Sequence, residues 1–163
     1  MDSLTWDDAD ADLVIWSDAC LVGLGFCYAS QGFVYRICPS PVPVDIFFLE
    51  LVAIMSAIFH VASLHHPPRR LLVFSDSLDS VCVLNTLSAS EALHNAPLRG
   101  ISEIILMTGI DLRVWHIPRV DNVRADLLSR LLVDDYRKLF PSHRVRTFAP
   151  PRELLPARWR ESF

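Results

Sequence analysis

The sequence lacks several features that would place the protein in or beyond a membrane. No apolar run reaches the roughly 20 residues that a membrane-spanning helix needs, because Glu50 interrupts the longest one, between Val44 and Phe59. The start, Met1-Asp2-Ser3, shows neither the basic residues nor the apolar stretch of a secretory signal. The four cysteines show no CxxC spacing, which favours buried free thiols in a reducing compartment over disulfides or zinc ligands. We therefore expect an intracellular protein, cytoplasmic or nuclear, with no membrane contact.

Basic residues are scarce in the first two thirds of the chain. Residues 1–112 carry four arginines against thirteen acidic residues, whereas residues 113–163 carry eleven basic residues against six acidic ones. The net charge of -4 is a poor match for a protein that binds nucleic acid on its own. The asymmetry is compatible with a basic surface beside an acidic site, and equally with a basic solvated tail.

Internal repeats and low-complexity segments are also absent, and 163 residues suffice for one domain with a substantial core. Hydrophobic periodicity and turn residues predict strands at 12–17, 23–28, 32–37, 70–75 and 112–116, with a turn at 30–32 between the second and third. They predict helices at 44–64, 78–87, 97–108 and 121–132, the last capped by Asp121. The order βββαβααβα predicts an α/β domain with a five-stranded mixed sheet and helices on both faces.

This pattern divides the chain into three parts. Residues 1–11 form an N-terminal extension, residues 12–132 the domain, and residues 133–163 an Arg/Pro-rich C-terminal tail. The tail is expected to be extended. The alternative is that it folds back onto the sheet through its apolar residues, which are Phe148, Leu154, Leu155 and Trp159.

Four acidic residues stand in apolar surroundings. Asp18 and Asp76 each close a predicted strand, so both lie at the same sheet edge if those strands are parallel neighbours. Glu50 lies inside a helix that is apolar on almost every face, and Asp126 lies one turn into the last helix. Each has a simpler interpretation: a turn residue for Asp18 and Asp76, a partner of a buried arginine for Glu50, and an acid favoured by the helix dipole for Asp126.

Taken together, the four carboxylates predict a metal site. An ionised carboxylate in an apolar setting is unfavourable unless a cation or hydrogen-bond donors compensate it. Oxygen-only ligands favour Mg²⁺ or Mn²⁺ over zinc. Two such ions about 3.5–4 Å apart can hold the attacking and leaving oxygens of a phosphodiester during an in-line displacement.

Four segments resemble, in the same order, the ribonuclease H motifs of reverse transcriptases. They are Ser17-Asp18-Ala19-Cys20 with Gly23-Leu24-Gly25, then Glu50-Leu51-Val52-Ala53-Ile54, then Phe74-Ser75-Asp76-Ser77, and then His116-Ile117-Pro118-Arg119-Val120-Asp121-Asn122-Val123-Arg124-Ala125-Asp126-Leu127-Leu128-Ser129-Arg130. The last segment is the most specific. It closely resembles the His-Ile-Pro, Asn, Ala-Asp and Leu-Ser-Arg block of retrotransposon enzymes.

The resemblance covers residues 12–132 and implies a ribonuclease H-like fold that cleaves the RNA strand of RNA–DNA hybrids. It implies that two Mg²⁺ ions, for which Mn²⁺ can substitute, are bound by Asp18, Glu50, Asp76 and Asp126. His116 matches a histidine that would assist proton transfer or product release, unless it is a strand-end histidine bonded to backbone. The spacing of the motifs resembles that of LTR or tyrosine-recombinase retrotransposons and of pararetroviruses, which implies an attached reverse-transcriptase polymerase domain as partner.

Two departures from the family keep a second hypothesis open. Arg119 stands where the family usually has glycine. The segment between Asp76 and Asp111 has no room for the extra basic helix of cellular ribonucleases H, and its one basic residue is Arg99. The alternative is a weakly active or inactive remnant that serves as a scaffold or protein-interaction domain. An exonuclease would need an acid where Cys20 stands, and an integrase-type enzyme would leave Asp126 without a role.

Overall fold

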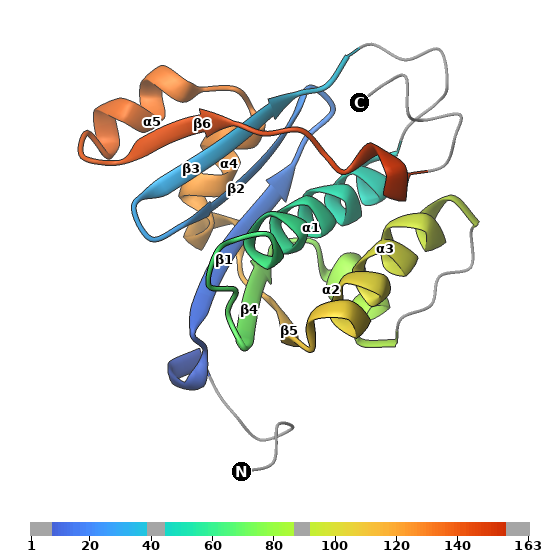
Figure 1. Ribbon diagram of the computed structural model, residues 1–163. Helices are drawn as coiled ribbons and strands as arrows, with labels where there is room; N and C mark the ends of the chain where they lie inside the picture. Colours follow the sequence, from blue (N-terminus) through green and yellow to red (C-terminus); the bar gives the residue numbers. More distant parts are fainter. Residues whose placement is uncertain (1–7, 39–44, 87–91, 156–163) are drawn as a thin grey trace.

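Six strands form one mixed sheet in the order β5-β4-β1-β2-β3-β6 (Figure 1). The computed structural model describes residues 8–38, 45–86 and 92–155. The first three strands form an antiparallel meander, to which β4 and β5 add on one side and β6 on the other, all three parallel to their neighbours. The strands are β1 (Leu13–Ala19), β2 (Gly23–Tyr28), β3 (Gln31–Arg36), β4 (Arg70–Ser75), β5 (Asp111–His116) and β6 (Arg144–Thr147).

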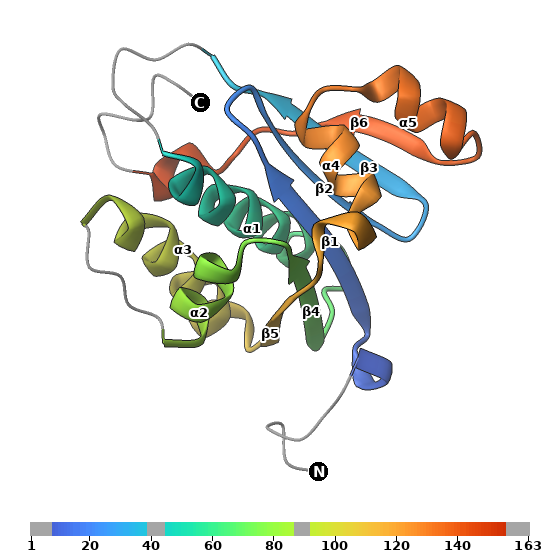
Figure 2. The ribbon, with the colours of Figure 1, turned by 180° about the vertical axis from the view of Figure 1, so that it is seen from behind.

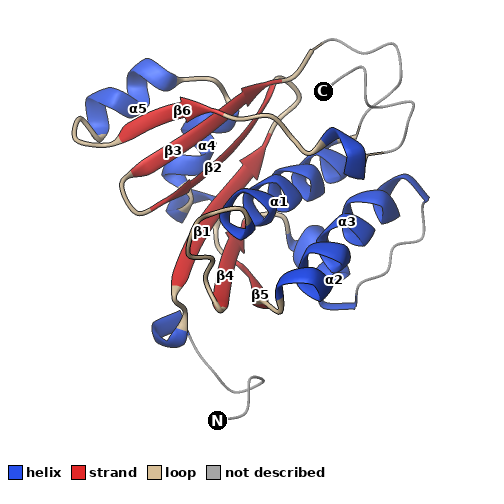
Figure 3. Cartoon of the chain, viewed as in Figure 1, coloured by secondary structure: helices blue, strands red, loops and turns tan. Residues whose placement is uncertain are grey.

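Helices cover both faces of the sheet (Figures 2 and 3). They are α1 (Ile46–Ala62), α2 (Leu78–Thr86), α3 (Ala92–Thr108), α4 (Val123–Ser129) and α5 (Val133–Leu139). The long helix α1 packs on β1 and β2 with α3 beside it, whereas α4 lies against β1, β2 and β3 on the opposite face. The α/β class, the mixed sheet and the expected order of elements as far as α4 are confirmed.

The expected number of five strands is wrong, because β6 adds a sixth at the edge beside β3. Its sequence, Arg-Val-Arg-Thr, has one apolar residue and is largely exposed, so hydrophobic periodicity could not reveal it. The expected extended tail is thus folded over residues 133–155, which contain α5, β6 and a 3-10 turn (Arg152–Leu154). Phe148, Leu154 and Leu155 pack on the core, as the fold-back alternative anticipated. Trp159 lies outside the described residues, and the limits of the domain stay a prediction.

Several predicted boundaries of helices and turns differ from those in the structure. Helix α3 begins at Ala92, so Pro97 is inside it and not at its start. The hairpin between β2 and β3 turns at residues 29–30, one position before the expected turn, with Ala29 at a positive φ of 50°. Asp121 does not cap α4. It ends a 3-10 turn that begins at Arg119, and Asn122 occupies the N-cap position.

The core explains why α1 is apolar on almost every side. The sheet, α3 and the returning segment at residues 148–155 all pack around it, so Phe48 to Ile58 are buried without interruption. Asp45 caps the helix by accepting a hydrogen bond of 2.7 Å from the Phe48 amide. None of the described helices is both long and apolar enough to cross a bilayer. Of the four cysteines, Cys27 alone is fully buried, so the expectation of buried thiols holds in part.

Candidate metal centre

Parallel pairing of β1 with β4 places two carboxylates side by side. Ser17 lies opposite Ser75 in the register, so Asp18 and Asp76 follow at the same edge of the sheet. Both strands are largely apolar, and more than half of their residues are buried. The expectation that these two residues meet at one sheet edge is confirmed in geometry.

Glu50 approaches the same point from α1, which crosses β1. One carboxylate oxygen from each of Asp18, Glu50 and Asp76 lies within 4.8 Å of the other two. Asp18 and Glu50 are each only 5% exposed, whereas Asp76 is half-buried. The three oxygens therefore converge from two strand ends and a helix, as a ligand set for a single small cation requires.

Burial and the charges of neighbouring acids disfavour the charged forms of Glu50 and Asp18. Burial raises the pKa of Glu50 to about 9, and the charges of Asp18 and Asp76 act in the same direction. Burial also raises the pKa of Asp18 to about 6, with further contributions from Asp76 and Asp126, partly offset by a hydrogen bond from Ser129. Such a cluster is unfavourable in its ionised form until a cation compensates it.

One buried oxygen of the site, Glu50 Oε2, has no hydrogen-bond partner among the described residues. Buried polar atoms are almost always satisfied in folded proteins, so this oxygen needs an explanation. Carboxylate oxygens are the ligands that Mg²⁺ and Mn²⁺ prefer. The donor set, its spacing and the unpartnered Glu50 oxygen therefore fit a site for hard divalent cations.

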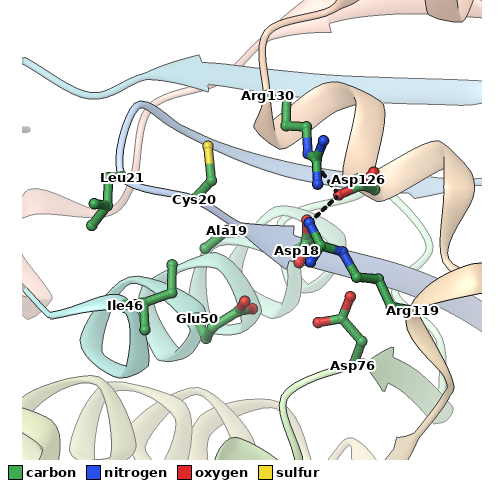
Figure 4. A pocket seen from close by; sticks show the side chains of 10 residues that line it. All are labelled: Asp18, Ala19, Cys20, Leu21, Ile46, Glu50, Asp76, Arg119, Asp126 and Arg130. Carbon is green, nitrogen blue, oxygen red and sulfur yellow. Dashed lines mark ion pairs between the residues drawn. The ribbon is translucent and has the colours of Figure 1, made fainter.

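The fourth carboxylate, Asp126, comes from α4 on the other face of the sheet. It lines the same pocket of about 580 Å³ as the other three acids (Figure 4). It is not one of the three acids whose oxygens cluster within 4.8 Å. Its Oδ1 lies 3.1 Å from Arg130 Nε and 3.6 Å from Arg119 Nη2. All four predicted acids thus share one pocket, with Asp126 held toward two arginines.

Two polar contacts fix α4 beside β1. Ser129 Oγ donates a hydrogen bond of 2.7 Å to Asp18 Oδ2, which links the helix directly to the site. Asn122 Nδ2 donates one of 2.9 Å to the Ser17 carbonyl, so this buried side chain anchors the start of the helix and does not cap it. A Cβ at Gly25 would lie 2.7 Å from Leu128 Cβ, so glycine is what allows the helix to approach β2 this closely.

His116 stands apart from the acids. It is exposed at the end of β5, where it lies opposite Ser75 in the register. It is not among the described residues that line the pocket. Its neighbour Ile117 bonds through its amide to the Ser75 carbonyl, so the backbone here belongs to the sheet edge.

Sequence reasoning missed the roles of Ser129, Arg119 and Arg130 in this pocket. The two arginines are part of the basic C-terminal third, and they do lie beside the acidic site, as the basic-surface interpretation anticipated. The positions of Ser129 and Arg130, three and four residues after Asp126 on one short helix, were the available signal.

Comparison with solved structures identifies the fold. No protein-family model and no curated protein matches the chain. Ribonuclease H1 from the halophilic archaeon Halobacterium salinarum NRC-1 matches with a TM-score of 0.57 and 18% identity, over 76% of this chain and 98% of that one. The chain has a ribonuclease H-like fold.

Two further structures with this ribonuclease H-like fold are similar to the chain. LC11-RNase H1, in complex with an RNA/DNA hybrid, matches with a TM-score of 0.57 and 18% identity, over 76% of this chain and 98% of that one. The prototype foamy virus protease-reverse transcriptase matches with a TM-score of 0.53 and 14% identity, over 81% of this chain but 22% of the viral one. At these identities the likeness establishes the fold alone.

Proposed function

We propose that the protein is a metal-dependent endoribonuclease that cleaves the RNA strand of RNA–DNA hybrids. The observation that carries the proposal is the convergence of four carboxylates, from β1, α1, the end of β4 and α4, on one pocket (Figure 4). Three of them bring oxygens within 4.8 Å of one another. Structural ion pairs do not require four acids in one place, whereas a pair of divalent cations does.

In this proposal Asp18, Glu50 and Asp76 hold the cations, and Asp126 completes the set from α4. Two bound ions would supply Lewis-acid stabilisation of the attacking water and of the departing 3′ oxygen. The chain itself contributes the positions of the carboxylates, and the hydrogen bond from Ser129 favours the ionised form of Asp18. We assign His116 an accessory part in proton transfer or product release, because it ends the strand next to the one that presents Asp76.

The partner we propose is a reverse-transcriptase polymerase domain on the same polypeptide, in a retroelement of the LTR, tyrosine-recombinase or pararetroviral type. The match to a fraction of the foamy virus protease-reverse transcriptase supports this arrangement. So does the acidic balance of the chain, because hybrid affinity depends on phosphate neutralisation that an attached domain can provide.

The test is cleavage of a labelled RNA–DNA hybrid in Mg²⁺ and in Mn²⁺. We expect the wild-type protein to cleave the RNA strand and Asp18→Asn to lose roughly 100-fold or more of that activity, since even outer partners of metal ligands cost up to about that factor. Asp134→Asn, which changes an exposed acid on α5, is the matched control and should cleave normally. Equal cleavage by wild type and Asp18→Asn, or none by wild type at high Mn²⁺, would disprove the proposal.

One observation favours the second candidate, a weakly active or inactive domain kept for protein contacts. Asp126 is paired with two arginines, which neutralise the carboxylate that the metals would need. This candidate predicts that hybrid and divalent ions together leave the protein's thermal stability unchanged. Stabilisation by the two together, beyond that given by either alone, would exclude it.

A further inference from the structure

Arg119 occupies a position at the mouth of the pocket from which it can move. It begins the 3-10 turn between β5 and α4, and its side chain is 66% exposed. Its ion pair with Asp126 is long, at 3.6 Å, and involves one guanidinium nitrogen. Exposed pairs of this kind contribute little to stability because solvent screens them and ordering a long side chain is unfavourable.

Arg130 is held more firmly on the same oxygen. Its Nε lies 3.1 Å from Asp126 Oδ1, its side chain is 45% exposed, and the two residues are four apart along α4 and its C-cap. A divalent ion that bound Asp126 would be a third cation on one carboxylate. Repulsion would then expel the more weakly held and more exposed partner, which is Arg119.

The released guanidinium would be next to the substrate. It carries five donors in a planar fork that matches the oxygens of a phosphate. Besides Arg119 and Arg130, the pocket is lined by four acids and four uncharged residues, and the segment between Asp76 and Asp111 offers only Arg99 for phosphate contact. A nucleic-acid strand that approaches the carboxylates therefore needs a cation at the rim, and Arg119 is located there (Figure 4).

We propose that Arg119 exchanges partners: it neutralises Asp126 while divalent ions are absent and binds a backbone phosphate of the hybrid once they are present. This inference rests on the proposed function. It makes Arg119 a positioning residue that couples metal occupancy to substrate binding, at the position where related motifs usually have glycine.

Hybrid binding with and without divalent ions tests the exchange. Affinity is measured in EDTA and in Ca²⁺, whose larger radius and looser coordination disfavour the chemical step. We expect Arg119→Ala to weaken binding in Ca²⁺ by about tenfold and to lower the slope of log K against log salt by about one, as loss of one phosphate contact does. In EDTA the variant should bind as the wild type does. Arg119→Lys should restore the slope, because it retains the charge.

Calorimetric titration with Mn²⁺ alone tests the other half of the exchange. Removing Arg119 should tighten Mn²⁺ binding by up to about fivefold, the equilibrium equivalent of one exposed ion pair. Arg137→Ala, which removes an exposed arginine of α5, is the control for lost charge and should change neither measurement.

The results separate this inference from the proposed function. Two results would show that the partner exchange is wrong while the nuclease stands, provided that the wild type cleaves hybrid. In the first, Arg119→Ala binds hybrid in Ca²⁺ as tightly as the wild type does. In the second, Arg119→Ala loses as much affinity in EDTA as it loses in Ca²⁺. Equal effects of Arg137→Ala would also overturn the exchange. If the wild type neither binds nor cleaves hybrid, the nuclease proposal fails, and unchanged Mn²⁺ affinity in Arg119→Ala would then remove the exchange as well.

Discussion

Asp18 lies between the two halves of the site. Its carboxylate faces Glu50 and Asp76 on one side, and its Oδ2 accepts a hydrogen bond from Ser129 of α4 on the other. The pKa of Asp18 results from the balance between burial, which raises it to about 6, and this hydrogen bond, which lowers it. The Ser129 hydroxyl therefore keeps the pKa of Asp18 below the value that burial and the neighbouring acids alone would give.

Replacing Ser129 with alanine should shift the pH dependence of cleavage. Without the donor the pKa of Asp18 rises further, so a higher pH is needed to ionise it. The acidic limb of the pH–rate profile therefore shifts to higher pH. The variant should also lose about 1 kcal/mol of stability. The check is to measure cleavage rates at subsaturating Mg²⁺ from pH 5 to pH 9, a range of about four units that includes the pKa of Asp18.

Ser56→Ala is the matched control, because Ser56 is also buried and donates to a backbone carbonyl inside α1. It should lose comparable stability and leave the pH profile in place. An unshifted profile in Ser129→Ala would show that the hydrogen bond does not control the ionisation of Asp18.

At the scale of elements, the distance between α4 and β2 sets the position of Asp126. A Cβ at Gly25 would lie 2.7 Å from Leu128 Cβ and 2.8 Å from the Ser129 amide nitrogen, so the helix backbone would have to move. We expect Gly25→Ala to cost about 1–3 kcal/mol of stability and to weaken Mn²⁺ binding. Thermal unfolding and calorimetric titration would measure the two effects.

Gly32→Ala is the comparison on the neighbouring strand. Its Cβ would meet the end of the Leu128 side chain at 3.1 Å and the Tyr136 ring at 3.3 Å, which can adjust without moving the helix backbone. Mn²⁺ affinity should therefore stay near the wild-type value. Equal Mn²⁺ affinities of the Gly25 and Gly32 variants would contradict the view that the distance between α4 and β2 determines the geometry of the metal site.

The returning C-terminal segment should matter for stability and not for metal binding. Phe148 follows β6 directly. The centroid of its ring lies 4.8 Å from the centroid of the Phe26 ring and 5.9 Å from that of the Tyr35 ring. Phe148→Ala should cost about 2 kcal/mol, less than a fully buried phenylalanine because this one is half-buried. Denaturant unfolding measures the loss, with Leu139→Ala, 62% exposed, as control. A loss of Mn²⁺ affinity in Phe148→Ala would contradict this separation.

At the scale of the whole molecule, the buried acids should make stability depend on pH in an unusual direction. The folded-state pKa values of Glu50 (about 9) and Asp18 (about 6) lie above their ordinary values of 4.5 and 3.8. The folded protein therefore binds more protons than the unfolded chain between these limits. Without metal, the contribution of these two acids to the free energy of unfolding should be most favourable below about pH 4. It should fall as the pH rises toward about 9.

Mg²⁺ should reverse this fall in stability, because it binds the ionised carboxylates. As the pH rises, fewer protons compete with Mg²⁺ for these carboxylates, so the metal stabilises the folded protein more. Melting temperatures recorded across this range in EDTA and in Mg²⁺ check both statements, with each kcal/mol gained raising Tm by about 2–4 °C. Glu50→Gln cannot ionise and should flatten the dependence in EDTA. A variant with the same slope as the wild type would show that Glu50 is not the group responsible.

Much of the fold followed from local patterns, because long periodic segments report directly on burial. The strands β1, β2 and β4 are short, largely apolar runs, and their positions could be predicted to within about two residues. Elements with mixed sequence could not. Strand β6 is stabilised by its pairing with β3 and by Phe148, neither of which leaves a periodic signal in four residues.

The sequence by itself determined the α/β class and the order of elements as far as α4, since these depend on residues close together in the chain, and it singled out the four acids that line the pocket. The tertiary structure alone decided which of those acids share oxygens within a few ångströms, and that Asp126 faces two arginines. It also decided that Ser129 donates to Asp18 across 111 positions. Such contacts depend on strand register and helix seating, which arise from packing between distant segments and have no local signature.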